Sequence, residues 1–125
     1  MNQAVKILVV DDNTPFRHLL AAFLKKSGYA TLEATDGQEA LEILNRESVD
    51  AVLLDLQMQP VGGFTFMPEY RELGHRAPVI LVTGDPSTDI LERAAKMGFA
   101  GVMKKPVTEA HVLRMVARVT EPVAA

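Results

Sequence analysis

The chain has 125 residues, the usual size of one domain, and 48% of them are hydrophobic while 23% are charged. This composition supports a buried core, so we expect a single domain over 1–125, with 120–125 as a loose tail. A net charge of −3 offers no basic field for nucleic acid, and the absence of cysteine excludes a thiolate nucleophile. No apolar run reaches the roughly 20 residues of a membrane helix. We therefore expect a cytoplasmic protein that binds neither nucleic acid nor membrane directly.

Three nearly continuous apolar runs, 5–10, 51–54 and 79–82, predict strands. Because they are rich in β-branched residues and lack polar alternation, they are typical of strands buried on both faces of a parallel sheet. Two weaker segments, 30–34 and 101–103, predict the strands at the sheet edges.

The first predicted helix has an apolar stripe at the i, i+3, i+4, i+7 and i+8 positions and ends near Gly28. The stripe consists of Phe16, Leu19, Leu20, Phe23 and Leu24. Its basic residues are expected on the solvated side, and these are Arg17, Lys25 and Lys26.

The later helices are marked by signals at their starts. Asp36 with Glu39 three residues later resembles a capping box, and Ser87 and Thr108 precede two further helical patterns. The third helix is the least regular, because Pro68 is tolerated only in a first turn and would start the helix late or kink it.

The alternation of five strands and five helices predicts right-handed crossovers and a doubly wound α/β fold. We expect a flavodoxin-like five-stranded parallel sheet with strand order 2-1-3-4-5. In such sheets ligands bind beyond the carboxyl ends of the strands. The candidate site residues are therefore those that follow the first, third, fourth and fifth strands, namely Asp11, Asp12, Asp55, Thr83 and Lys105.

Three carboxylates brought to one crevice need a counter-charge. Two carboxylates about 5 Å apart repel by roughly 3 kcal/mol at an effective dielectric constant of 20. A hard divalent cation with oxygen ligands suits such a cluster, whereas zinc would require histidine or cysteine. The pattern favours Mg²⁺, particularly if a phosphoryl group binds beside it.

The ordered set of motifs resembles the response-regulator receiver domains of two-component signal transduction, in particular the chemotaxis-regulator type. The resemblance covers essentially the whole chain. The matching features are the pair Asp11 and Asp12, Asp55 with Met58 three and Gly63 eight residues later, the segment 82–84, and the dipeptide Lys105-Pro106.

The resemblance implies a phosphoacceptor and a metal site. Asp55 would accept the phosphoryl group. Asp12 would bind Mg²⁺ directly and Asp11 through water, while Asp55 and the backbone carbonyl of Gln57 would complete the protein ligands.

It also implies a switch around the phosphoryl group. Thr83 would hydrogen-bond that group, and Lys105 would pair first with Asp55 and then with a phosphoryl oxygen. The family lysine directly precedes the proline, so the preceding Lys104 is expected in solvent, and the bond to Pro106 is expected to be cis.

Other positions bear on the lifetime and output of the phosphorylated state. Gln57 and Asp85 would flank the path of the hydrolytic water. The sequence departs from the family at Gln59, where a proline usually stands, and at Val102, where an aromatic residue is common. The aromatic part of the switch is therefore absent.

The sequence thus predicts a signalling module, not an enzyme, although it would assist its own phosphorylation and dephosphorylation. A histidine kinase or histidine phosphotransferase would donate to Asp55, and output would pass to a protein through the fourth helix, fifth strand and fifth helix. One alternative is an aspartyl-nucleophile phosphohydrolase, which requires a second aspartate where this chain has Gln57. Another is a degenerate receiver that acts only by binding. The cognate kinase, the input signal, the output and the oligomeric state stay open. So does the choice between a stand-alone regulator and an excised domain of a hybrid kinase or longer regulator.

Overall fold

The computed structural model describes residues 4–58, 62–85 and 87–120. Its sheet contains five parallel strands in the order β2-β1-β3-β4-β5, which confirms the predicted topology. The strands are β1 (Lys6–Val10), β2 (Ala30–Ala34), β3 (Ala51–Asp55), β4 (Val79–Thr83) and β5 (Gly101–Lys104).

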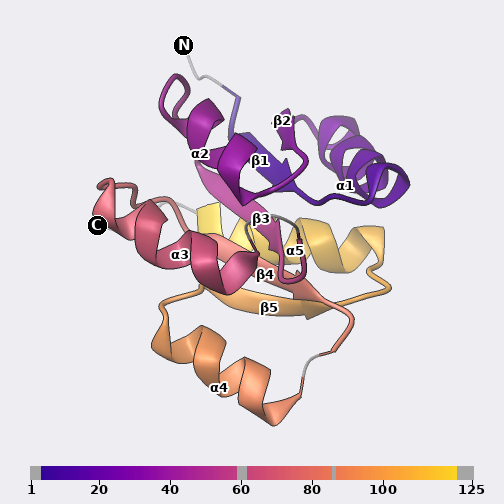
Figure 1. Ribbon diagram of the computed structural model, residues 1–125. Helices are drawn as coiled ribbons and strands as arrows, with labels where there is room; N and C mark the ends of the chain where they lie inside the picture. Colours follow the sequence, from indigo (N-terminus) through magenta and orange to yellow (C-terminus); the bar gives the residue numbers. More distant parts are fainter. Residues whose placement is uncertain (1–3, 59–61, 86, 121–125) are drawn as a thin grey trace, which may run out of the picture.

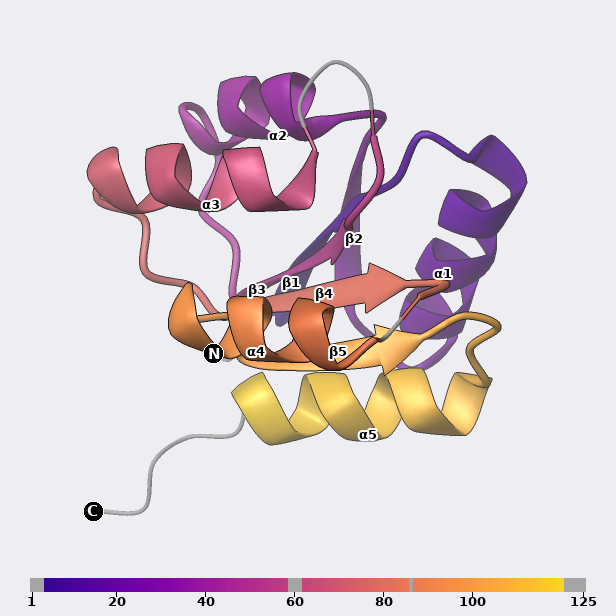
Figure 2. The same ribbon diagram turned by 60° about the horizontal axis from the view of Figure 1, so that its bottom comes forward.

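Helices cover both faces of the sheet (Figure 1). They are α1 (Thr14–Lys26), α2 (Gly37–Leu44), α3 (Gly63–Glu72), α4 (Thr88–Lys96) and α5 (Glu109–Thr120). One core cluster joins the sheet to α1 and α5, and the other joins it to α2, α3 and α4. Figure 2 shows this layering, with α2 and α3 above the sheet and α5 below it. The described residues therefore have the predicted three-layer arrangement.

The central strands form the middle of both clusters. Every residue of β3 and β4 is buried, whereas β2 and β5 at the edges are only partly covered. In β1, Leu8 and Val10 face the α2, α3 and α4 side while Ile7 and Val9 face the α1 and α5 side. This double burial is why the central strands lack an alternating polar pattern.

Most helix ends are formed by the residues that the sequence indicated. The side chains of Asp36, Ser87 and Thr108 each accept a hydrogen bond from the backbone N–H three residues later, at 2.9, 3.4 and 3.1 Å. Gly28 and Gly98 follow α1 and α4 with φ of +93° and +86°, which favours glycine after a helix.

The buried face of α1 differs from the predicted stripe. Four residues of the stripe contact the core, but the most deeply buried face is rotated about the helix axis, and Leu19 is 44% exposed. The most deeply buried residues are Arg17, Leu20, Ala21 and Leu24. The expectation that Arg17 lies in solvent is wrong, because its guanidinium donates to the Asp11 carbonyl and to Glu33, both at 2.9 Å. These partners compensate for burial of the charge.

The third helix and the C-terminal tail also differ from expectation. Helix α3 begins at Gly63, so Pro68 lies in its second turn and the helix does not start late. The ring lacks the N–H that would bond the Phe64 carbonyl. Of the predicted tail, Thr120 is the last residue of α5, and 121–125 lie outside the described residues. No helix among those described is long and apolar enough to cross a membrane.

Candidate metal and phosphoryl site at the carboxyl ends of the strands

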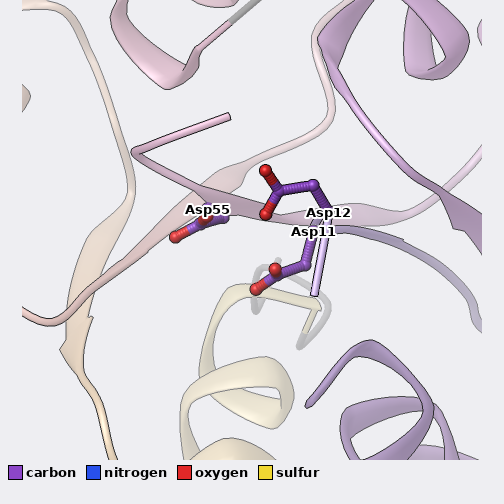
Figure 3. A group of neighbouring side chains, drawn as sticks. All are labelled: Asp11, Asp12 and Asp55. Atoms are coloured by element: carbon purple, nitrogen blue, oxygen red, sulfur yellow. The ribbon is translucent and has the colours of Figure 1, made fainter. Parts of the chain in front are cut away.

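Three carboxylates meet where β1 and β3 end. Asp11 and Asp12 follow β1 and Asp55 is the last residue of β3, and one carboxylate oxygen from each lies within 4.8 Å of the others. Figure 3 shows the side chains gathered at this edge of the sheet. Asp11 and Asp55 are buried, at 1% and 6% exposure, while Asp12 is exposed. The fold therefore brings together the three acidic residues selected from the sequence.

The ammonium group of Lys105 lies between the two buried carboxylates. Its Nζ is 3.1 Å from Asp55 Oδ1 and 3.2 Å from Asp11 Oδ2. The pair with Asp55 is the one that the resemblance implied, whereas the pair with Asp11 was not foreseen. As expected, the neighbouring Lys104 is exposed and the peptide bond to Pro106 is cis.

The charges in this cluster do not balance. Burial and the neighbouring Asp11 raise the pKa of Asp55 above its usual range, although Lys105 opposes the shift. Burial lowers the pKa of Lys105, but the carboxylates of Asp55 and Asp11 outweigh it and raise that pKa overall. One ammonium thus pairs with two of the three carboxylates, and the site keeps an excess of negative charge.

Hydrogen bonds to both the side chain and the backbone of Asp11 hold it in place. The backbone N–H of Asn13 donates to Asp11 Oδ1 at 2.8 Å, and the buried Arg17 donates to the Asp11 carbonyl. Glu33 on β2 in turn accepts from Arg17 Nε at 2.9 Å. The role of Arg17 was missed because a charged residue beside a hydrophobic stripe normally faces water.

Thr83 lies next to the cluster at the end of β4 and is 2% exposed. Its hydroxyl accepts a hydrogen bond from the Asp85 N–H at 3.0 Å, which closes a short turn. The Thr83 carbonyl accepts from the N–H of Lys105 at 2.8 Å, which connects the ends of β4 and β5. Asp85 itself is exposed.

Two motif residues after Asp55 pack close to the end of β3. Met58 is 4% exposed and lies in the core, and Gly63 opens α3 directly behind Asp55. A Cβ at Gly63 would lie 3.0 Å from Leu81 Cδ1 and 3.2 Å from the Asp55 carbonyl oxygen, so a side chain there would crowd the strand end. The Gln57 side chain is exposed. The departure at Gln59 lies outside the described residues.

Val102 lies on the edge strand β5, where it is half-buried against the α2, α3 and α4 cluster. The adjacent α4 has one buried residue, Ala94, and its Leu91 is 44% exposed. A separate hollow of about 620 Å³, between 44–49 and 74–77, lies at the opposite end of the strands and includes none of the site residues.

The donor set of the cluster fits a hard divalent cation. All three groups are carboxylate oxygens, two of them are buried, and a single ammonium compensates them. Mg²⁺ prefers such oxygen ligands and retains some of its waters. The exposed position of Asp12 leaves one side of the cluster in contact with solvent.

The comparisons with known proteins agree with this fold. The family model of the response regulator receiver domain matches residues 7–117. The chain therefore belongs to the receiver domain family, the signalling modules of two-component systems.

Among its relatives, the sensor histidine kinase RcsC of Salmonella typhimurium is 36% identical over 107 residues, which cover 86% of this chain and 11% of that protein. The response regulator receiver protein Anae109_2439 of Anaeromyxobacter is 34% identical over 108 residues, with 86% and 45% covered. The chain thus spans about a tenth of the kinase and under half of the receiver protein.

Solved structures show the same fold. The chemotaxis protein CheY4 of Vibrio cholerae superimposes with a TM-score of 0.89 at 27% identity, covering 94% of this chain and 99% of that one. The receiver domain of the sensor histidine kinase PA1611 of Pseudomonas aeruginosa gives a TM-score of 0.87 at 25% identity, with 96% and 100% covered. That structure has a magnesium ion coordinated in its active site cleft.

Proposed function

We propose that Asp55 is the phosphoacceptor of this receiver and that a histidine kinase or histidine phosphotransferase is its donor. The observation that carries the proposal is the position of the Asp55 carboxylate, which lies in the acidic cluster with Lys105 Nζ at 3.1 Å. It is the carboxylate at the end of the central strand β3. The cytoplasm is the proposed compartment, because histidine kinases are phosphorylated by ATP there.

The transfer requires a nucleophile and neutralisation of charge. A carboxylate oxygen of Asp55 forms a bond to phosphorus while the bond from phosphorus to the donor imidazole nitrogen breaks, and that nitrogen leaves with the bonding electron pair. Lys105 moves from the carboxylates to a phosphoryl oxygen. Mg²⁺, when bound, supplies further neutralisation of the phosphoryl oxygens, and Asp11, Asp12, Asp55 and the carbonyl of Gln57 are its proposed ligands.

The chain takes part in this reaction as a stoichiometric acceptor, because Asp55 is itself modified. Loss of the phosphoryl group requires attack by water, and we place Gln57 and Asp85 beside its path. Both side chains are exposed, so they are free to meet solvent at the mouth of the site. They would set how long the phosphorylated state lasts.

Output is proposed to pass to a protein partner through α4, β5 and α5. The Thr83 hydroxyl would leave its turn with Asp85 to bond the phosphoryl group, and α4 can follow because it buries one residue only. Val102 has no ring to rotate, so phosphorylation should shift the conformational equilibrium of this face only modestly. Amide chemical shifts with a beryllofluoride mimic should lie between the two states; a complete shift that persists in Thr83→Ala would contradict this.

The test of the phosphoacceptor is intact-mass analysis after incubation with acetyl phosphate. The wild-type chain with Mg²⁺ should gain one phosphoryl group, and Asp55→Asn should gain none. Asp89→Asn is the matched control, because Asp89 is an exposed aspartate in the first turn of α4. Stoichiometric labelling of Asp55→Asn would refute the assignment, and an unlabelled wild-type chain would favour a receiver that only binds.

A further inference from the structure

An aromatic ring borders the ammonium group of the site. Lys105 Nζ lies 4.6 Å from the centroid of the Phe16 ring, in addition to its two carboxylate partners. This distance lies within the range of a cation–π interaction. Phe16 is half-buried and packs against the core cluster shared by α1 and α5. The ring therefore lies between the hydrophobic core and the ammonium group of Lys105.

The turn that fixes Asp11 also fixes the backbone of Phe16. The Asn13 side chain caps α1 by accepting the Phe16 N–H at 2.9 Å, and the Asn13 backbone N–H donates to Asp11 Oδ1 at 2.8 Å. Pro15 lies in the first turn, where its fixed φ suits the start of a helix. Phe16 is thus held independently of the Lys105 side chain.

The partners of Lys105 differ in what happens to them during phosphoryl transfer. Asp11 and Asp55 are the residues to which we assign the cation and the phosphoryl group, so their oxygens become engaged elsewhere. The face of the Phe16 ring is no ligand for a hard cation and repels an anion, because its quadrupole is negative. The ring alone can keep its contact with the ammonium throughout the reaction.

We propose that Phe16 is a positioning residue for Lys105, which keeps the ammonium within reach of the phosphoryl oxygens once the carboxylates are engaged. This inference rests on the proposed function of Asp55 and Lys105. A ring at this position restricts the flexible lysine stem, so that less conformational freedom is lost when the phosphoryl group arrives. Its contribution is to the rate of transfer and not to cation binding.

The experiment compares Phe16→Leu, which keeps an apolar side chain but no ring, with Phe16→Tyr, which keeps the ring. At saturating Mg²⁺ and with acetyl phosphate as donor, Phe16→Leu should be phosphorylated about 3- to 10-fold more slowly, the range that the strength of a cation–π contact implies. Phe16→Tyr should react within twofold of wild type. Mg²⁺ affinity, measured by calorimetry, should be the same in all three proteins.

A spectroscopic readout separates positioning from a merely structural effect. A methylene group above an aromatic face has proton resonances shifted upfield by the ring current. The Lys105 Hε signals, identified by their absence in Lys105→Arg, should be shifted upfield in wild type and Phe16→Tyr and not in Phe16→Leu. The shift should be present in the metal-free protein and persist with Mg²⁺ and beryllofluoride.

Several outcomes would overturn the inference. An unchanged rate in Phe16→Leu, an equal loss of rate in Phe16→Tyr, or Lys105 resonances that do not respond to the ring would each do so while Asp55 remains the phosphoacceptor. If the wild-type chain accepts no phosphate, the proposed function fails and the inference fails with it. If Phe16→Leu does not fold, Phe16→Met provides the same comparison with a longer unbranched side chain.

Discussion

The two ends of the sheet differ in how their charged and polar groups are paired. At the amino end, Lys6 pairs with Glu47 at 3.1 Å, its backbone N–H donates to Asp50 at 2.8 Å, and the buried Tyr70 hydroxyl donates to the Ala77 carbonyl at 2.8 Å. At the carboxyl end, three carboxylates gather, and a single ammonium pairs with the two that are buried. Each of these amino-end groups has a partner, although the nearby buried His75 Nε2 has none among the described residues, whereas at the carboxyl end the carboxylates outnumber the ammonium group.

This difference indicates that the polar groups at the amino end stabilise the folded state, whereas those at the carboxyl end form a functional site. Two carboxylates within 4.8 Å of each other repel by roughly 3 kcal/mol or more at an effective dielectric constant of 20, which is a substantial part of the stability of a small domain. Buried like charges with perturbed pKa values are typical of functional sites. A bound cation would relieve an imbalance of this kind.

The largest effect is expected from Asp12→Ala, which removes the exposed member of the acidic cluster. If the carboxyl end is a cation site, loss of one ligand should slow Mg²⁺-dependent phosphorylation by about 100-fold or more, because a metal supplies several kcal/mol of charge stabilisation. Acetyl phosphate labelling followed over time measures this. Asp89→Asn should react like wild type, and a rate for Asp12→Ala within threefold of wild type would count against the site.

Cation binding should also stabilise the folded protein. At a Mg²⁺ concentration tenfold above the dissociation constant, linkage predicts about 1.4 kcal/mol and an increase in Tm of about 5 °C. A thermal melt followed by circular dichroism, with and without Mg²⁺, provides the measurement. The increase in Tm should vanish in Asp12→Ala. A wild-type Tm that does not change with millimolar Mg²⁺ would show that the excess negative charge does not form a Mg²⁺ site.

Without metal, removing a charge from the carboxyl end should raise stability. The pKa of Asp55 is raised above its ordinary value of 3.8 by burial and by Asp11, so its contribution to stability is present at low pH and lost as pH rises through the folded-state pKa. At pH 7, Asp55→Asn should therefore melt at a higher temperature than wild type. The difference in Tm between Asp55→Asn and wild type should disappear below pH 3.8. A destabilised Asp55→Asn at pH 7 would show that the Lys105 contact dominates.

The smallest effect is expected at the amino end. Glu47→Gln removes the charge that faces Lys6, and both side chains of this pair are exposed, at 41% and 36%. Exposed pairs contribute roughly 0.2–1 kcal/mol, so Tm should fall by no more than about 4 °C, and Mg²⁺ should not alter the difference. A Mg²⁺-dependent change in Glu47→Gln would contradict the separation between the two ends.

The parts of the fold that general rules determine were predictable. Doubly buried strands produce unbroken apolar runs, and crossover handedness with strand order places the residues after β1, β3, β4 and β5 at one edge. Hence all five candidate site residues could be grouped from sequence, namely Asp11, Asp12, Asp55, Thr83 and Lys105.

What the sequence could not provide depends on side-chain conformation. Arg17 is buried because two acceptors happen to face it, and no periodicity reveals them. The Lys105 contacts with Asp11 and with the Phe16 ring likewise follow from how a flexible side chain is oriented. Pro68 in the second turn of α3 shows that packing can override a local preference.

The central claim, that Asp55 carries the phosphoryl group, is tested most directly by locating the acyl phosphate chemically. Borohydride reduces an aspartyl phosphate to homoserine, so the wild-type chain, treated with acetyl phosphate and Mg²⁺ and then reduced, should contain homoserine at position 55 by peptide mass spectrometry. The aspartates at 11, 12 and 85 should remain unchanged. Homoserine at any of these positions, with Asp55 intact, would contradict the account.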